Sequence, residues 1–130
     1  MRVIRVSILM AMALIAAAPA GAQRGGWRLL GEREVNDRVD RDVIPVRGER
    51  RFSQVRICVG TQAVRFYDVD IRFRNGGNQD VAIRSLIRPG GCTRNIALTG
   101  RGGRDITSVA FTYEAASLRR ARSHVRVFGR

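Results

Sequence analysis

Few residues of this sequence have the types and spacing that catalysis requires. His124 is the one histidine, so a Ser–His–Asp arrangement would have to use it. It alternates with valine and arginine near the end of the chain, a pattern that predicts a surface position on a strand. Two separated cysteines and one histidine do not supply the three or four ligands of a zinc site. These residues predict no catalytic centre, metal site or cofactor site, and they favour a protein that is not an enzyme.

Oxygen-bearing side chains are dense in residues 68–80, and such density is compatible with a calcium site. We favour a simpler explanation, in which outward-facing acids pair with Arg72 and Arg74 and the asparagines serve a turn. The oxygen-bearing residues are Asp68, Asp70, Asn75, Asn78 and Asp80.

Arginines near two adjacent glycine-rich turns are the best candidates for binding an anion. Residues 100–104 (GRGGR) superficially resemble a phosphate-binding loop, but such loops need a helix after them and here a strand is expected. The cluster itself still places several guanidinium groups close together, against the alternative of an ordinary solvated basic surface. The predicted anion-binding residues are Arg41, Arg94, Arg101 and Arg104.

The first 22 residues have the three parts of a signal peptide. Two arginines precede an uncharged run of thirteen residues (6–18), and Pro19 and the small residues 20–22 (AGA) follow. A membrane-spanning helix would need at least about 17 apolar residues, so the run is too short for an anchor. We expect cleavage before Gln23, with Gly21 as a second frame, and a periplasmic or secreted product of 108 residues that forms one domain.

The expected mature chain is strongly basic. It has 22 arginines, no lysine and 11 acids, which gives a formal charge of +11. Such a charge on a small body attracts polyanions, and the attraction falls as salt is added. Nucleic acid is an improbable partner, because the protein is expected to be exported and aromatic residues are not interleaved with the arginines of 119–122. The expected partners are an anionic glycan, a lipid headgroup or an acidic envelope protein.

Cys58 and Cys92 are the two cysteines of the chain. In an exported protein an even number of cysteines is compatible with one disulfide, which here would close a loop of 34 residues. The alternative is two unpaired thiols on neighbouring strands.

Short alternating segments separated by turns predict an all-β fold. Residues 64–74 are the clearest, and the inward set Val64 and Phe66 is out of phase with the set that begins at Val69, so a β-bulge is expected near 67–68. We expect a loop with one possible helical turn at 114–123. Seven or eight strands predict an antiparallel sandwich, jelly-roll-like or a partly open barrel. The predicted strands are 27–30, 43–46, 52–59, 64–74, 81–85, 93–99, 106–113 and 124–128.

Several of these segments together resemble a known family of small exported bacterial proteins of unknown function, DUF2541. The resemblance rests on 27–31 (WRLLG), 40–44 (DRDVI), 68–71 (DVDI) with Asn75-Gly76, 90–96 (GGCTRNI) and 127–129 (VFG). It implies a Gram-negative envelope setting and an all-β fold, and it transfers no active site.

The sequence therefore favours a non-enzymatic envelope module that presents a basic surface to an anionic partner. One alternative is an enzyme that acts on an envelope polysaccharide, with Asp40, Asp42 or the Asp68–Asp70 pair in a concave pocket. The other is a structural or assembly subunit that pairs through an edge strand.

Overall fold

The computed structural model describes residues 26–35, 39–48, 50–115 and 122–130, and this part of the chain contains strands and no helix. The predicted all-β fold is confirmed. The strands are β1 (Arg28–Val35), β2 (Val39–Pro45), β3 (Arg51–Phe52), β4 (Gln54–Val59), β5 (Val64–Phe73), β6 (Asn78–Val81), β7 (Ser85–Ile87), β8 (Ile96–Ala97), β9 (Arg104–Ala115) and β10 (Ser123–Gly129).

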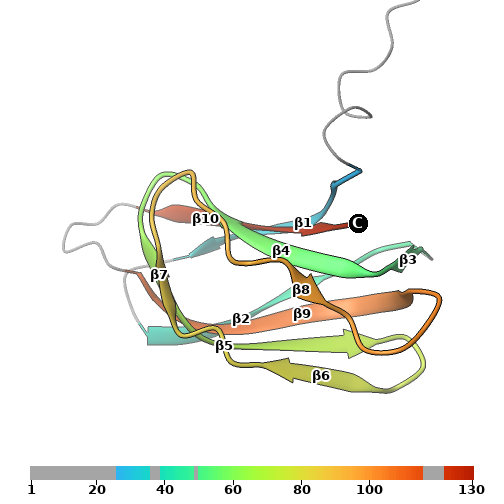
Figure 1. Cartoon of the computed structure of the whole chain (residues 1–130). Helices are drawn as coiled ribbons and strands as arrows, with labels where there is room; N and C mark the ends of the chain where they lie inside the picture. The colour runs from blue at the N-terminus through green and yellow to red at the C-terminus, as the bar shows by residue number, and fades with distance from the viewer. Residues whose placement is uncertain (1–25, 36–38, 49, 116–121) are drawn as a thin grey trace, which may run out of the picture.

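The strands form two antiparallel sheets that face each other (Figure 1). One sheet has the order β1-β10-β4-β8, and the other has the order β2-β9-β5-β6, with β7 also paired to β5 and β3 paired to β9. The arrangement is that of a β-sandwich. Pro45 ends β2, which is an edge strand, so its missing N–H costs no ladder hydrogen bond.

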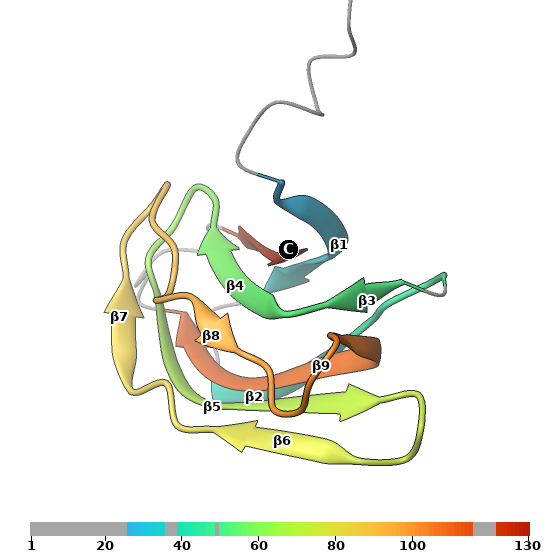
Figure 2. The ribbon, with the colours of Figure 1, turned by 45° about the vertical axis from the view of Figure 1, so that its right-hand side comes forward.

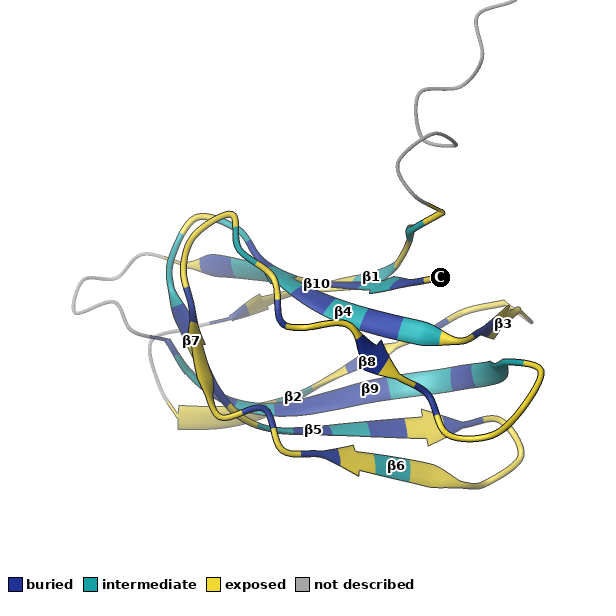
Figure 3. Ribbon diagram, viewed as in Figure 1, coloured by how far each residue is buried: buried dark blue, intermediate teal, exposed yellow. Residues whose placement is uncertain are grey.

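Alternation along the strands builds the core between the sheets. In β4 every second residue is buried, and β5 and β10 repeat the pattern (Figure 3). Because successive side chains of a strand point to opposite faces, the intervening residues lie on the outer surfaces. Fully buried members of the core include Val55, Ile57, Phe66, Val69, Ile71, Val109, Phe111, Val125 and Val127.

The predicted bulge in β5 is confirmed. The pairing of β5 with β9 shifts between Phe66 and Asp68, which leaves Tyr67 as the extra residue. Phe66 before the shift and Val69 after it are both fully buried, although they are three positions apart and a regular strand would place them on opposite faces. The bulge therefore keeps both halves of β5 facing the core.

Two predicted strand limits were wrong at the start of the chain. Gly31 was expected to end the first strand, but β1 continues through it to Val35, with a register shift at residues 29–31. A Cβ at Gly31 would lie 2.3 Å from Cγ2 of Ile44, so glycine is needed for the close approach of β1 and β2. The predicted strand 52–59 is divided at Ser53, where the chain passes from one sheet to the other (Figure 2).

Other limits changed because pairing partners decide where a strand ends. The return strand predicted at 81–85 is two strands, β6 and β7, and the segment predicted at 93–99 contributes the two residues of β8. Glu114 and Ala115 were expected in a loop, but they belong to β9 and pair with Val39 and Val64. Ser123, at the other end of the same expected loop, belongs to β10. Residues 116–121 of that loop and the predicted signal peptide, 1–22, lie outside the described residues.

Candidate anion-binding site

A surface hollow of about 830 Å³ lies at the end of the sandwich where β1 begins and β10 ends. Five of its lining residues are arginines, and none of the described residues that line it is acidic. We call it the arginine hollow. Its walls are Gly26, Trp27, Arg28, Leu29, Arg50, Arg51, Phe52, Arg56, Phe128 and Arg130.

Strand pairing brings these walls together from distant parts of the sequence. Phe128 of β10 pairs with Arg56 of β4, and the neighbouring Gly129 pairs with Arg28 of β1. The Arg130 carbonyl accepts hydrogen bonds from the backbone N–H groups of Ser53 and Gln54 at 2.8 and 3.0 Å. Since Ser53 is the point where the chain changes sheet, β3 and its arginines are fixed beside the end of β10.

Aromatic rings hold two of the guanidinium groups. Cζ of Arg56 lies 4.4 Å from the ring centroid of Trp27 and 5.7 Å from that of Phe128. Cζ of Arg130 lies 4.9 Å from the Trp27 centroid, and its Nη2 donates a hydrogen bond of 2.7 Å to Gln54. A contact with a ring face supplies no hydrogen-bond acceptor, so it leaves guanidinium N–H groups of Arg56 available for an anion.

Two smaller hollows adjoin the arginine hollow. The first, of about 430 Å³, shares Arg28, Leu29, Arg50 and Phe52 with it and adds Arg47. The second, of about 440 Å³, shares Arg51 and extends to the turn before β9. We call this end of the sandwich the arginine end; the arginines of its three hollows are Arg28, Arg47, Arg50, Arg51, Arg56, Arg101, Arg104 and Arg130.

The structure brings together two of the four arginines predicted to bind an anion. Arg101 and Arg104 line the hollow beside Arg51. Arg104 is already engaged, because Nη1 donates to the Thr99 carbonyl at 2.8 Å and its Cζ lies 3.7 Å from the Phe73 ring centroid. Arg101 is exposed and has no partner among the described residues.

The other two predicted arginines lie elsewhere. Arg41 is on β2, where its Nη2 is 3.6 Å from Oδ2 of Asp70. Arg94 is exposed in the segment before β8 and does not line the three hollows. The sequence interpretation missed the arginine hollow, because its parts are far apart in the chain. The one available signal was an aromatic residue close to arginine at the start of the first strand and at the end of the last one, at Trp27-Arg28 and at Phe128-Gly129-Arg130.

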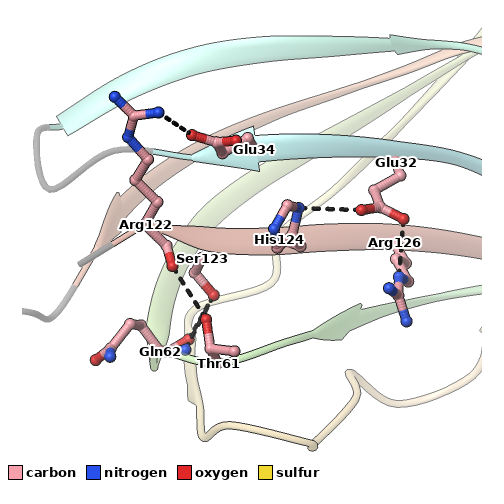
Figure 4. Close-up of polar contacts among 8 residues, drawn as sticks. All are labelled: Glu32, Glu34, Thr61, Gln62, Arg122, Ser123, His124 and Arg126. Carbon is pink, nitrogen blue, oxygen red and sulfur yellow. Dashed lines mark hydrogen bonds and ion pairs between the residues drawn. The ribbon is translucent and has the colours of Figure 1, made fainter.

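The opposite ends of β1 and β10 form a different cluster, which we call the paired end (Figure 4). Glu32 accepts a hydrogen bond of 2.9 Å from Nε of Arg126, and its other oxygen lies 3.0 Å from Nδ1 of His124. Glu34 lies 3.0 Å from Nη1 of Arg122. Acids and bases of the described residues therefore balance one another here.

His124 and Ser123 do not form a nucleophile–base pair. They are adjacent on β10, so their side chains leave opposite faces of the strand. The Ser123 hydroxyl is buried, accepts a hydrogen bond from the Gln62 N–H at 3.1 Å and donates one to the Gln62 carbonyl at 2.9 Å. This serine fastens the segment after β4 to β10.

The aspartates that an enzyme reading would require do not line the three hollows. Asp42 accepts a hydrogen bond of 2.9 Å from the Tyr113 hydroxyl and lies 3.2 Å from Nη2 of Arg33. Asp40 caps the backbone N–H of Arg41 at 2.8 Å. Both carboxylates thus contact groups of the protein, and neither lines the three hollows.

In the oxygen-rich segment 68–80, the side chains of Asp68, Asp70 and Asp80 lie on the outer face of β5 and β6. Burial, and then a hydrogen bond with Asp80, raise the pKa of Asp68 above its ordinary value of 3.8. Asp70 accepts a hydrogen bond of 3.2 Å from Asn78 and lies 3.8 Å from Nε of Arg72. Within the described residues, no group of three or more histidines, cysteines or acids is arranged to hold a metal ion.

Cys58 and Cys92 are joined by a disulfide, and they also form an isolated antiparallel bridge between β4 and the segment before β8. Cys58 lies on the outer face of β4, two residues from Arg56 and opposite Arg126 of β10. The bond therefore fastens the long connection between β7 and β8 onto the first sheet.

Comparison with protein families identifies the family of the chain. Residues 6–129 match the model of a domain of unknown function, DUF2541. The chain belongs to the DUF2541 family. The match covers nearly all of the chain, as the resemblance in its turns and strands predicted. A search of curated proteins found no match. Within the described residues of this DUF2541 protein, no helix has the length and apolar character needed to cross a membrane.

Among solved structures, the DUF2541 chain is similar to AlgX of Pseudomonas aeruginosa, from a work titled as its structural and functional characterisation. The TM-score is 0.50 at 14% sequence identity, and the match covers 78% of this chain. The chain spans about a quarter of that protein, since 26% of it is covered. At this identity the likeness concerns the fold alone.

Proposed function

We propose that this protein is an exported, non-enzymatic module of the cell envelope that binds a linear anionic polymer at the arginine end. The observation that carries the proposal is the run of three adjoining hollows with eight arginines, where Asp105 is the one acid among the described lining residues. Asp105 is itself compensated, because its Oδ2 accepts a hydrogen bond of 2.9 Å from Nε of Arg74.

The extent of the arginine end favours a polymer over a small ion. Neighbouring hollows share lining residues, so successive charged units of one chain have cationic contacts without a gap. Apolar walls from Trp27, Leu29, Phe52 and Phe128 add surface for the uncharged part of each unit. A site with positive walls and little acid concentrates polyanions, and the effect weakens with salt.

Export is the second part of the proposal. Residues 1–22 are a signal peptide on this reading, and the product acts in the periplasm or outside the cell. The disulfide between Cys58 and Cys92 supports this, because such bonds persist in oxidising compartments. Mass spectrometry of the protein purified from a host with an intact export pathway should give a chain that begins at Gln23 or Gly21; a retained Met1 in the folded product would contradict it.

The binding test compares two double variants that remove the same charge. The processed protein is titrated with polygalacturonate and dextran sulfate, and with neutral dextran as a control, at low and high salt. Arg50→Gln with Arg51→Gln should weaken polyanion binding by about tenfold, because two exposed charge contacts are lost. Arg122→Gln with Arg126→Gln at the paired end should change it by less than about threefold, since these arginines are held by glutamates.

The outcomes distinguish a defined binding site from attraction by total charge. Equal losses in the two double variants would show that binding reflects total charge and has no site. Absence of polyanion binding at low salt would overturn the proposed function, and equally strong binding of neutral dextran would overturn its electrostatic basis.

A further inference from the structure

The guanidinium of Arg56 carries a charge that the described protein does not compensate. Its Nε is buried and has no hydrogen-bond partner. None of the ion pairs of the described residues includes it. A buried donor without an acceptor destabilises the folded protein. The same guanidinium belongs to a residue that lines the arginine hollow, where an anion from outside would compensate its charge.

The rings around Arg56 restrict how that anion can approach. Trp27 lies against the guanidinium at 4.4 Å and Phe128 at 5.7 Å, and Arg130 stacks on Trp27 in turn. Both rings lie within cation–π distance of the guanidinium, so they hold it in place and restrict the directions from which an anion can reach it. The N–H groups of a guanidinium lie in one plane, and the rings hold this fork in place before a ligand binds.

We propose that Arg56 recognises the planar carboxylate of an acidic sugar unit within the polymer. This inference rests on the proposed function and adds selectivity to it. Two coplanar carboxylate oxygens match two parallel N–H donors. A sulfate or phosphate can also accept two such donors, but its further charged oxygens would then lie beside the apolar rings of Trp27 and Phe128, which offer them no hydrogen-bond donor of comparable strength. Leu29, which is 50% exposed, supplies apolar surface for the sugar ring beside the carboxylate.

The first test replaces the fork and keeps the charge. Wild type and Arg56→Lys are titrated with polygalacturonate, dextran sulfate and polyphosphate at one salt concentration. Arg56→Lys should lose about tenfold in affinity for polygalacturonate, because a charge-assisted paired contact becomes a single point charge. Its affinity for dextran sulfate and polyphosphate should change by less than about threefold, since total charge is unchanged. Arg94→Lys is the matched control and should leave all three affinities as in wild type.

The second test removes the ring that positions the fork. Trp27→Leu should narrow the preference for polygalacturonate over dextran sulfate while the salt dependence of binding stays the same, because no charge has been removed. If Trp27 has only a structural role, Trp27→Leu should lower the affinity for all the polymers by the same factor. Circular dichroism identifies a variant that fails to fold, and Arg56→Lys then decides the question alone.

The two proposals fail in different ways. If the wild type binds the three polymers equally and Arg56→Lys changes none of them, carboxylate recognition is wrong while the binding function stands. If the wild type binds none of the three, the proposed function itself is wrong. If dextran sulfate or polyphosphate binds best and Arg56→Lys weakens it, the fork recognises a tetrahedral anion and the carboxylate assignment is overturned.

Discussion

The two ends of the β1–β10 pair carry similar side chains and put them to different use. At the paired end, Glu32 contacts Arg126 and His124. At the arginine end of the same ladder, Arg28 and Arg56 meet aromatic and apolar residues and no described acid. Both ends belong to one antiparallel ladder, although its register shifts between Leu29 and Gly31 at the arginine end.

The difference shows what an arginine needs in order to be available to a ligand. Exposed ion pairs contribute little stability, but they satisfy the guanidinium that takes part. At the arginine end, rings supply the orientation that a carboxylate supplies at the paired end, and they leave the hydrogen-bond donors open. Net charge alone would not distinguish these two situations.

Loss of the disulfide should give the largest effect on stability. Because Cys58 pairs with Arg126 of the paired end, this loss also tests whether a change there affects binding at the arginine end. Cys58→Ser with Cys92→Ser opens a closed loop of 34 residues, and we expect the free energy of unfolding to fall by about 3–4 kcal/mol. Denaturant unfolding measures this loss. The affinity of the folded variant for polygalacturonate should change by less than about twofold, because Arg56 rests on Trp27 and Phe128. A large loss of affinity in the folded variant would show that the ends are coupled.

Neutralising the acids of the paired end tests whether arginines without carboxylate partners are sufficient to bind a polyanion. Glu32→Gln with Glu34→Gln leaves Arg122, His124 and Arg126 without carboxylate partners. Polyanion binding at low salt should rise by less than about threefold, because only the general field increases. Unfolding stability should change by less than about 1 kcal/mol. A tenfold rise in affinity would mean that the aromatic support at the other end is unnecessary.

The smallest expected effect on stability is on the outer face of β5 and β6. There Asp68 lies beside another acid, Asp80, so removing a charge should stabilise the protein instead of destabilising it. Burial, and then Asp80, raise the pKa of Asp68 in the folded protein above 3.8. The folded state thus holds the proton more tightly, so the free energy of unfolding falls as pH rises from 3.8 through the raised pKa. Asp68→Asn should stabilise the protein at pH 7 by no more than about 0.5 kcal/mol after solvent screening.

Thermal unfolding over a pH series measures this effect. The gain from Asp68→Asn should vanish below pH 3.8, where the acid is protonated in both states. A gain that persists unchanged at low pH would mean that packing, rather than the proton, causes it.

Much of the fold was predictable because alternation is a local property. The bulge at Tyr67 followed from two buried sets on β5 that are out of phase, and the structure places it there. Strand ends were predicted less well, because they depend on the neighbour. Glycine is typical of turns, yet β1 continues through Gly31. Glycine is needed there because Ile44 of β2 occupies the space that a side chain would fill.

The site was predictable only where its residues are close in sequence. Arg101 and Arg104 flank one turn and do share a hollow. Arg41 was also predicted to bind an anion, but Asp70, on another strand of the same sheet, lies beside it. Arg56 looked like any outward residue of an alternating strand.

By itself the sequence determined the all-β architecture, the antiparallel strands, the family and the excess of arginine. The physical reason is that side-chain periodicity and composition are set by neighbours along the chain. Tertiary structure alone decided which arginines are neutralised and which stand open, because that depends on what the paired strands bring within a few ångströms. Trp27, Arg56 and Phe128 meet only when β1, β4 and β10 lie side by side.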